Sequence, residues 1–101
     1  MIARMWTGWT IHEDADSYEQ FVHAHVFPHL RTIDGYQGGY ILRHDADADV
    51  EFVVMTLFTS LDAVRAFAGP DATVAVIEPE ARRLLSRVEP RARHYTVNVA
   101  P

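Results

Sequence analysis

The spacing of hydrophobic residues predicts four β-strands in this chain. Apolar side chains alternate along an expected strand, because successive residues of a strand point to opposite faces of the sheet. The alternation occurs over residues 2–11, 36–44 and 51–59, and a stretch rich in β-branched and aromatic residues follows at 91–99. Residues of both parities are apolar at 51–59, so both faces of that strand should be covered.

Apolar residues at helical spacing predict three helices, at 16–26, 61–68 and 79–88. The helix at 61–68 has the clearest ends. Ser60 suits its N-cap, and Gly69 suits a turn that ends it. Residues 71–77 fit neither periodicity, and their structure is left unassigned.

The first helix carries signals at both of its ends. Asp16, with Glu19 three residues later, predicts a capping box at the start. Pro28 removes an amide and disfavours helical geometry before it, so the helix should end or kink near Val26.

The order of these elements is that of a ferredoxin-like βαββαβ fold, an α+β architecture with a four-stranded antiparallel sheet. We expect residues 1–101 to form a single domain, because the chain is long enough for one core and too short for two. Helices cover only one face of such a sheet. The apolar residues on the second face therefore indicate a partner chain, and we expect a homodimer through the sheet face.

Composition narrows the classes of partner. The formal net charge is −5, with nine arginines and no lysine, which argues against a general nucleic-acid-binding surface. The absence of cysteine excludes disulfides and thiolate chemistry. No apolar run approaches the roughly 18 residues of a membrane span, and residues 1–11 lack the apolar core of a signal peptide, so we expect no membrane partner and a cytoplasmic location.

Several short motifs are spread over nearly the whole chain. They are the opening Ile2-Ala3-Arg4-Met5-Trp6 with Gly8, the glycines Gly35 and Gly38, the stretch Leu57 to Gly69, Pro79-Glu80 with Leu84-Leu85, and Glu89-Pro90 before His94-Tyr95-Thr96-Val97. On these residues the chain resembles the antibiotic biosynthesis monooxygenase-like (ABM) proteins of the dimeric α/β barrel superfamily. The resemblance implies a dimeric α/β barrel built from ferredoxin-like protomers.

The superfamily includes cofactor-free oxygenases of aromatic polyketides, haem-degrading oxygenases and isomerases, so fold alone does not choose among them. The resemblance favours a cofactor-independent monooxygenase that acts on a small aromatic or polyketide-like substrate and uses no cofactor or metal. The alternative is a non-oxidative small-molecule binding protein or an isomerase that uses the same pocket.

Haem degradation is a distant third hypothesis. Haem-degrading relatives use an asparagine on the first strand, a tryptophan on the second helix and a histidine just beyond it. Here Asn98 is the only asparagine, and Phe67 stands where that tryptophan is expected. No histidine lies between His44 and His94.

An apolar pocket between helices and sheet is the expected ligand site. Its predicted lining is Trp6, His25, His29, Phe58, Phe67 and His94. His94 or His25 is the candidate catalytic base, because imidazole titrates near neutral pH, and apolar walls would shield a carbanion from water. The alternative for His94 is a structural hydrogen bond. The alternatives for His25 and His29, four residues apart, are a metal-binding pair or a structural role.

Two further patterns have competing interpretations. Arg4 shares a strand face with Trp6 and could bind an anionic substrate group or pair with an acid across the dimer, and we favour the pair. Asp45, Asp47 and Asp49 imitate the start of a calcium loop but lack its glycine and closing glutamate, so we expect a solvated hairpin.

Overall fold

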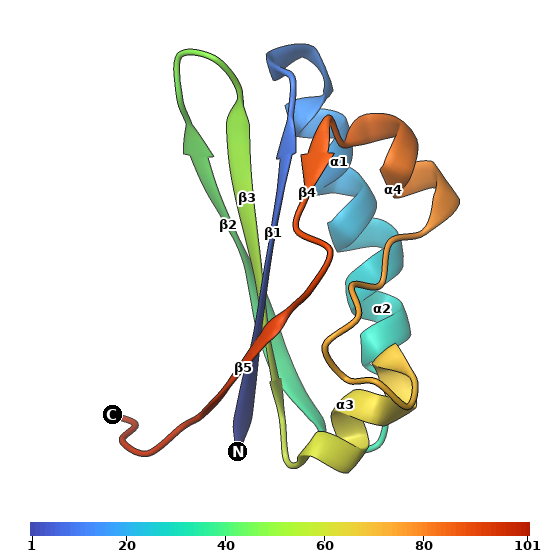
Figure 1. Ribbon diagram of the computed structural model, residues 1–101, viewed down its shortest axis with the longest axis vertical. Coiled ribbons are helices and arrows are strands. Elements are labelled where there is room, and N and C mark those ends of the chain that lie inside the picture. Colours follow the sequence, from blue (N-terminus) through green and yellow to red (C-terminus); the bar gives the residue numbers. More distant parts are fainter.

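The computed structural model describes residues 1–101 and contains one antiparallel sheet. Its strands are β1 (Ile2–Thr10), β2 (Tyr36–Asp45), β3 (Val50–Phe58), β4 (Arg87–Val88) and β5 (Arg93–Thr96). The order across the sheet is β2-β3-β1, and the short strands β4 and β5 both pair with the remaining edge of β1. This arrangement confirms the ferredoxin-like fold (Figure 1). The strand predicted at 91–99 is the shorter β5, and β4 is an additional short strand in the stretch predicted as the end of a helix.

All helices lie on one face of the sheet (Figure 1). They are η1 (His12–Asp14), α1 (Ala15–Phe21), η2 (Val22–Val26), α2 (Phe27–Leu30), α3 (Leu61–Ala68) and α4 (Pro79–Leu84). Two clusters of buried side chains fill the space beneath them. One contains Tyr18 and Phe52, and the other contains Leu30 and Phe58. None of the helices has the length and hydrophobicity that a membrane crossing requires.

The first helical region changes its hydrogen-bond pattern half-way along. The helix does not end near Val26, because α1 continues through the π-helical segment η2 into α2. The backbone N–H of Phe27 donates to the carbonyl of Val22, five residues earlier, which places one extra residue in that turn. Pro28, which has no N–H, lies in the first turn of α2 just after this widened turn.

The capping box predicted at Asp16 is wrong. Asp14 occupies the N-cap position of α1, and no side chain caps that helix. Asp16 instead lies 2.7 Å from the guanidinium of Arg43 on β2, which also binds Asp45 at 2.7 Å. The carboxylate of Asp16 therefore has a partner on a distant strand, which local sequence does not reveal.

The helix predicted at 79–88 is shorter in the structure. α4 ends at Leu84, and the backbone of Leu85 is extended, with φ −86° and ψ 129°. Ser86 then donates its backbone N–H to the carbonyl of Trp9 at 2.8 Å. The free edge of β1 thus supplies hydrogen-bond partners that a longer helix would have supplied internally.

The ends predicted for α3 are confirmed. The Ser60 side chain accepts a hydrogen bond from the Ala63 N–H at 3.2 Å, and Gly69 ends the helix with a φ of 94°. Residues 69–78, which we call the connecting segment, then run to α4 on the helix side of the sheet (Figure 1). An isolated bridge between Val74 and Arg91 is their one β-type pairing.

The second face of the sheet, which we call the open face, has no layer over it in this chain (Figure 1). In β1 and β3 the even-numbered residues face the helices, so the odd-numbered apolar residues lie on the open face. The apolar or aromatic side chains of this face are Met5, Trp9, Tyr40, Leu42, Val53, Met55, Leu57 and Tyr95. Tyr40 is 59% exposed and Tyr95 is 51% exposed. β3 therefore presents apolar side chains on both faces, and the cover expected over the open face stays a prediction.

Candidate functional site

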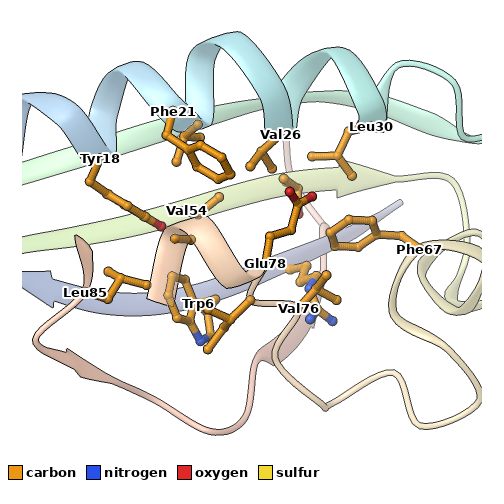
Figure 2. Close-up of a pocket in the computed structure, with 15 residues that line it drawn as sticks. Trp6, Tyr18, Phe21, Val26, Leu30, Val54, Phe67, Val76, Glu78 and Leu85 are labelled. Carbon is orange, nitrogen blue, oxygen red and sulfur yellow. The ribbon is translucent and has the colours of Figure 1, made fainter. Parts of the chain in front are cut away.

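A cavity lies between the two core clusters, enclosed by the sheet, the first helical region and the connecting segment (Figure 2). Twelve of its fifteen lining residues are hydrophobic. The lining consists of Arg4, Trp6, Tyr18, Phe21, Val22, Val26, Leu30, Val54, Thr56, Phe67, Val76, Ile77, Glu78, Ala81 and Leu85. An apolar enclosure with a few polar groups is the usual composition of a small-molecule site.

The cavity is narrow in this conformation. Its volume, counted by the centre of a water-sized sphere, is about 60 Å³, which is room for only a few water molecules. A ligand with aromatic rings therefore requires the walls to move. The wall formed by Val76, Ile77 and Glu78 has no helix or strand, whereas the opposite wall is the sheet.

Trp6 forms part of the sheet wall, as predicted. The absence of a side chain at Gly8 leaves room for its indole. The indole of Trp6 lies across Gly8, because a Cβ added at Gly8 would be 2.6 Å from Cη2 of the ring. The ring N–H donates to the carbonyl of Glu89 at 2.7 Å. This hydrogen bond satisfies the polar end of the indole and leaves its apolar surface to the cavity.

Phe67 lines the opposite end of the cavity and is also a predicted pocket residue. Its ring lies 5.7 Å from the guanidinium of Arg4. Phe58 is completely buried and stacks behind Phe67, with 6.4 Å between the ring centres. Phe58 therefore supports the wall from the core, and it is not among the lining residues.

Arg4 is the one cation of the lining, and it is only 4% exposed. Its guanidinium donates to the carbonyls of Ala72 and Val74 in the connecting segment, the latter at 2.9 Å. A third contact, of 3.2 Å, joins it to Nε2 of His94. No carboxylate lies within ion-pair distance of Arg4, and burial lowers its pKa to about 10, so it remains a cation at neutral pH.

The interpretation of Arg4 as one half of an ion pair across a dimer is wrong for this chain. Arg4 lies on the helix-facing side of β1, not on the open face. Arginine has five N–H donors, and three are directed to Ala72, Val74 and His94, which leaves two without a protein acceptor. The structure therefore supports the other interpretation, in which this side chain can bind an oxygen of a ligand.

His94 on β5 is a neighbour of Arg4 and does not line the cavity. Partial burial, and then the charge of Arg4, hold the pKa of His94 below its ordinary value. The imidazole is therefore neutral at pH 7, and its Nε2 accepts a hydrogen bond from Arg4. The lone pair that a catalytic base needs is directed at a protein group.

The two histidines of the first helical region also lie outside the cavity. His25 is exposed, packs against Phe21 with ring centres 5.3 Å apart, and borders a shallow polar depression between this helix and α4. The prediction places His25 in the pocket between helices and sheet, whereas the structure places it on the outer side of the helix, because the π turn changes the helical register from Val22 onward. His29 is exposed and contacts the outer side of Phe67, with ring centres 6.3 Å apart. No three histidine, aspartate or glutamate side chains gather as metal ligands.

Glu78 is a lining residue that the sequence reasoning missed. It is the N-cap residue of α4, and its carboxylate points toward the space between Val26 and Phe67 (Figure 2). The available signal was the Glu78-Pro79 pair, because a residue before proline is held in extended geometry outside the helix. That signal predicts the backbone geometry of Glu78 but not which cavity its side chain enters.

Comparisons with known proteins agree with this fold. No protein family model matches the sequence, and no curated protein matches it. Among solved structures, the chain is similar to a putative antibiotic biosynthesis monooxygenase from Bacillus cereus, with a TM-score of 0.67 and 14% sequence identity. The match covers 100% of this chain and 94% of the other. At this identity the likeness shows the fold, and the ABM-like fold expected from the motifs is confirmed.

Proposed function

We propose that this protein is a cofactor-independent monooxygenase that acts on a small aromatic or polyketide-like ketone held in the cavity. The observation that carries the proposal is Arg4, a buried cation without a carboxylate partner at the wall of an apolar cavity. A buried charge is costly unless it is compensated, so a ligand oxygen that carries negative charge is the natural complement to its two free N–H groups.

The chemistry that such a site favours is the formation of an enolate. Removal of a proton from a carbon beside a carbonyl puts the resulting negative charge largely on the oxygen, where Arg4 would stabilise it. The carbanion then transfers an electron to O₂, and the two radicals combine to a peroxide. Loss of water leaves a new carbonyl, so that a CH₂ group and O₂ give C=O and H₂O. The ABM-like fold shared with the Bacillus cereus protein supports this class of reaction.

Oxygen uptake tests the proposal directly. With anthrone as the substrate, we expect the protein to consume one O₂ for each anthraquinone formed, faster than the uncatalysed oxidation. Arg4→Gln should lower this rate by about 10²-fold, because it removes a charged donor to the developing oxyanion. An oxygen electrode and the absorbance of anthraquinone measure the two quantities.

Because Arg4 also binds the connecting segment, its replacement needs a folding control. Circular dichroism of Arg4→Gln checks the fold, and Arg4→Lys keeps the charge while it loses the paired donors. Anthrone turnover no faster than in buffer would contradict the monooxygenase. Proton exchange of the substrate without oxygen uptake would favour the isomerase or binding protein instead.

We also propose that the open face forms a homodimer with a second copy of the chain. Contiguous apolar residues on a face without a covering layer support this arrangement, since such patches mark interfaces. That residues 1–101 act as one domain in the cytoplasm stays a prediction from the sequence.

A further inference from the structure

The cavity contains two charged side chains, and they come from opposite walls. Arg4 belongs to the sheet, and Glu78 belongs to the end of the connecting segment. Of the other lining residues, Thr56 alone is not hydrophobic. A ligand that fills the space between the two charges would therefore meet one donor of hydrogen bonds and one acceptor, with apolar contacts elsewhere.

The carboxylate of Glu78 is not used by the fold. It makes no ion pair and no hydrogen bond, although an N-cap side chain often accepts a backbone N–H. Pro79 at the first helical position removes one of those N–H groups. Only the backbone of Glu78 serves the helix, through its carbonyl, which accepts the N–H of Arg82 at 3.0 Å.

The free carboxylate of Glu78 points toward the cavity from an extended backbone (Figure 2). Glu78 has φ −70° and ψ 153°, the extended geometry that a following proline favours. From there its side chain reaches the space beside Val26 and Phe67 (Figure 2). These neighbours are apolar, and Glu78 itself is exposed, so no group of the chain occupies the carboxylate and a ligand in the cavity can reach it.

We propose that Glu78 is the general base of this cavity and acts on the ketone of the proposed function. The carbonyl oxygen of the substrate binds Arg4, and the acidic C–H of the same molecule faces Glu78. The proton moves to the carboxylate, which becomes a carboxylic acid. The electron pair of the C–H bond moves into the ring system as an enolate, with its charge beside Arg4. The inference rests on the proposed function, and it assigns the proton-transfer step that precedes the reaction with O₂.

Deuterium exchange without oxygen isolates this step. Anthrone is incubated anaerobically in D₂O with the protein, and loss of the proton signal of its CH₂ group is followed by nuclear magnetic resonance. The unsubstituted protein should accelerate the exchange over buffer. Glu78→Gln should lower the protein-catalysed rate by about 10²- to 10⁴-fold, because the amide cannot accept the proton.

A matched control lies two residues away. Glu80 is in the first turn of the same helix and borders the shallow polar depression, not the cavity. Glu80→Gln removes the same charge and should exchange within about twofold of the unsubstituted protein. Anthraquinone, which has no acidic C–H, should bind Glu78→Gln as it binds the unsubstituted protein, and its quenching of tryptophan fluorescence in a Trp9→Phe background measures this.

The outcomes separate this inference from the proposed function. Exchange that depends on Glu78 without oxygen uptake supports the base and overturns the monooxygenase. Oxygen uptake that persists in Glu78→Gln overturns the base and leaves the monooxygenase standing. An unsubstituted protein that does not accelerate exchange overturns the assignment of Glu78, and equal losses in Glu78→Gln and Glu80→Gln overturn it as well.

Discussion

The contact between Arg4 and His94 explains why a histidine near the site need not be its base. The guanidinium directs an N–H at Nε2, so the imidazole serves as an acceptor that positions Arg4. Protonation of His94 would place two cations 3.2 Å apart in a partly buried site, and burial and the charge of Arg4 accordingly lower its pKa. This residue therefore links the geometry of the cavity to pH.

The lowered pKa of His94 predicts how stability depends on pH. The unfolded chain binds this proton more readily than the folded chain, so stability is fully present above about pH 6.5 and is lost as the pH falls below that value. We expect the thermal unfolding midpoint to fall when the pH is lowered from about 7.5 to about 5.5, and to fall less in His94→Gln than in the unsubstituted protein. The measurement is thermal unfolding at both pH values.

His23→Gln serves as the control for this comparison, because His23 is exposed and makes no hydrogen bond through its side chain. It should keep the pH dependence of the unsubstituted protein. If His94→Gln lost as much midpoint as that protein over the same range, the contact with Arg4 would not contribute to the pH dependence.

At the scale of single residues, the sequence predicted the apolar residues that line the cavity better than the charged ones. Trp6 and Phe67 lie in the cavity because strand parity and helical spacing place apolar residues toward the core. Arg4 shares its parity with Trp6, but the sequence could not show that its partners are the carbonyls of residues 72 and 74. The orientation of Glu78 depends on the connecting segment, whose apolar residues follow neither the helical nor the strand spacing. Its side-chain direction therefore could not be predicted from the sequence.

At the scale of elements, β1 is the strand on which the site depends, and Gly8 is its most constrained position. A Cβ at Gly8 would lie 2.6 Å from Cη2 of Trp6 and 3.1 Å from Cδ2 of Leu85. We expect Gly8→Ala to shift the indole and to cost about 1–3 kcal/mol of stability through overpacking. Chemical unfolding and the tryptophan emission spectrum measure these effects.

A double-variant cycle tests the origin of that cost. If the indole is the group that clashes, Trp6→Leu combined with Gly8→Ala should be less destabilising than the sum of the two single changes. Simple additivity would show that Gly8 is required for another reason. The second clash, with Leu85, is at a flexible side-chain end and is the smaller of the two.

The elements that the sequence predicted well are those with local signals. α3 begins and ends as Ser60 and Gly69 indicate, because a cap and a positive φ act within one turn. The end of α4 was predicted too late, because Arg87 and Val88 are paired with β1, a strand almost eighty residues earlier. Pairing with so distant a strand does not alter the spacing of apolar residues around Arg87 and Val88, so the sequence could not predict it.

At the scale of the whole molecule, the open face predicts the oligomeric state. Tyr40 is 59% exposed and Leu42 is 47% exposed in the single chain. Replacing both with aspartate places negative charge on the open face. We expect the unsubstituted protein to be a dimer at micromolar concentration and Tyr40→Asp/Leu42→Asp to be a monomer, as measured by light scattering.

Leu61→Asp is the matched control, because Leu61 is 38% exposed but lies on α3, away from the open face. It should remain a dimer. A monomeric unsubstituted protein would contradict the interface, and so would a dimer that survives both substitutions on β2.

The widened turn at Val22–Val26 has a consequence for how chains of this fold should be aligned. Leu30 follows Val22 by eight residues, yet both line the cavity, because the π turn takes up one residue more than an α-helical turn does. Seven residues of a regular α-helix make about two full turns, so a relative without the extra residue would keep the counterpart of Leu30 on the cavity side. An alignment should therefore place a one-residue gap within residues 22–26, because an ungapped alignment would compare Leu30 with a residue on another face of the helix.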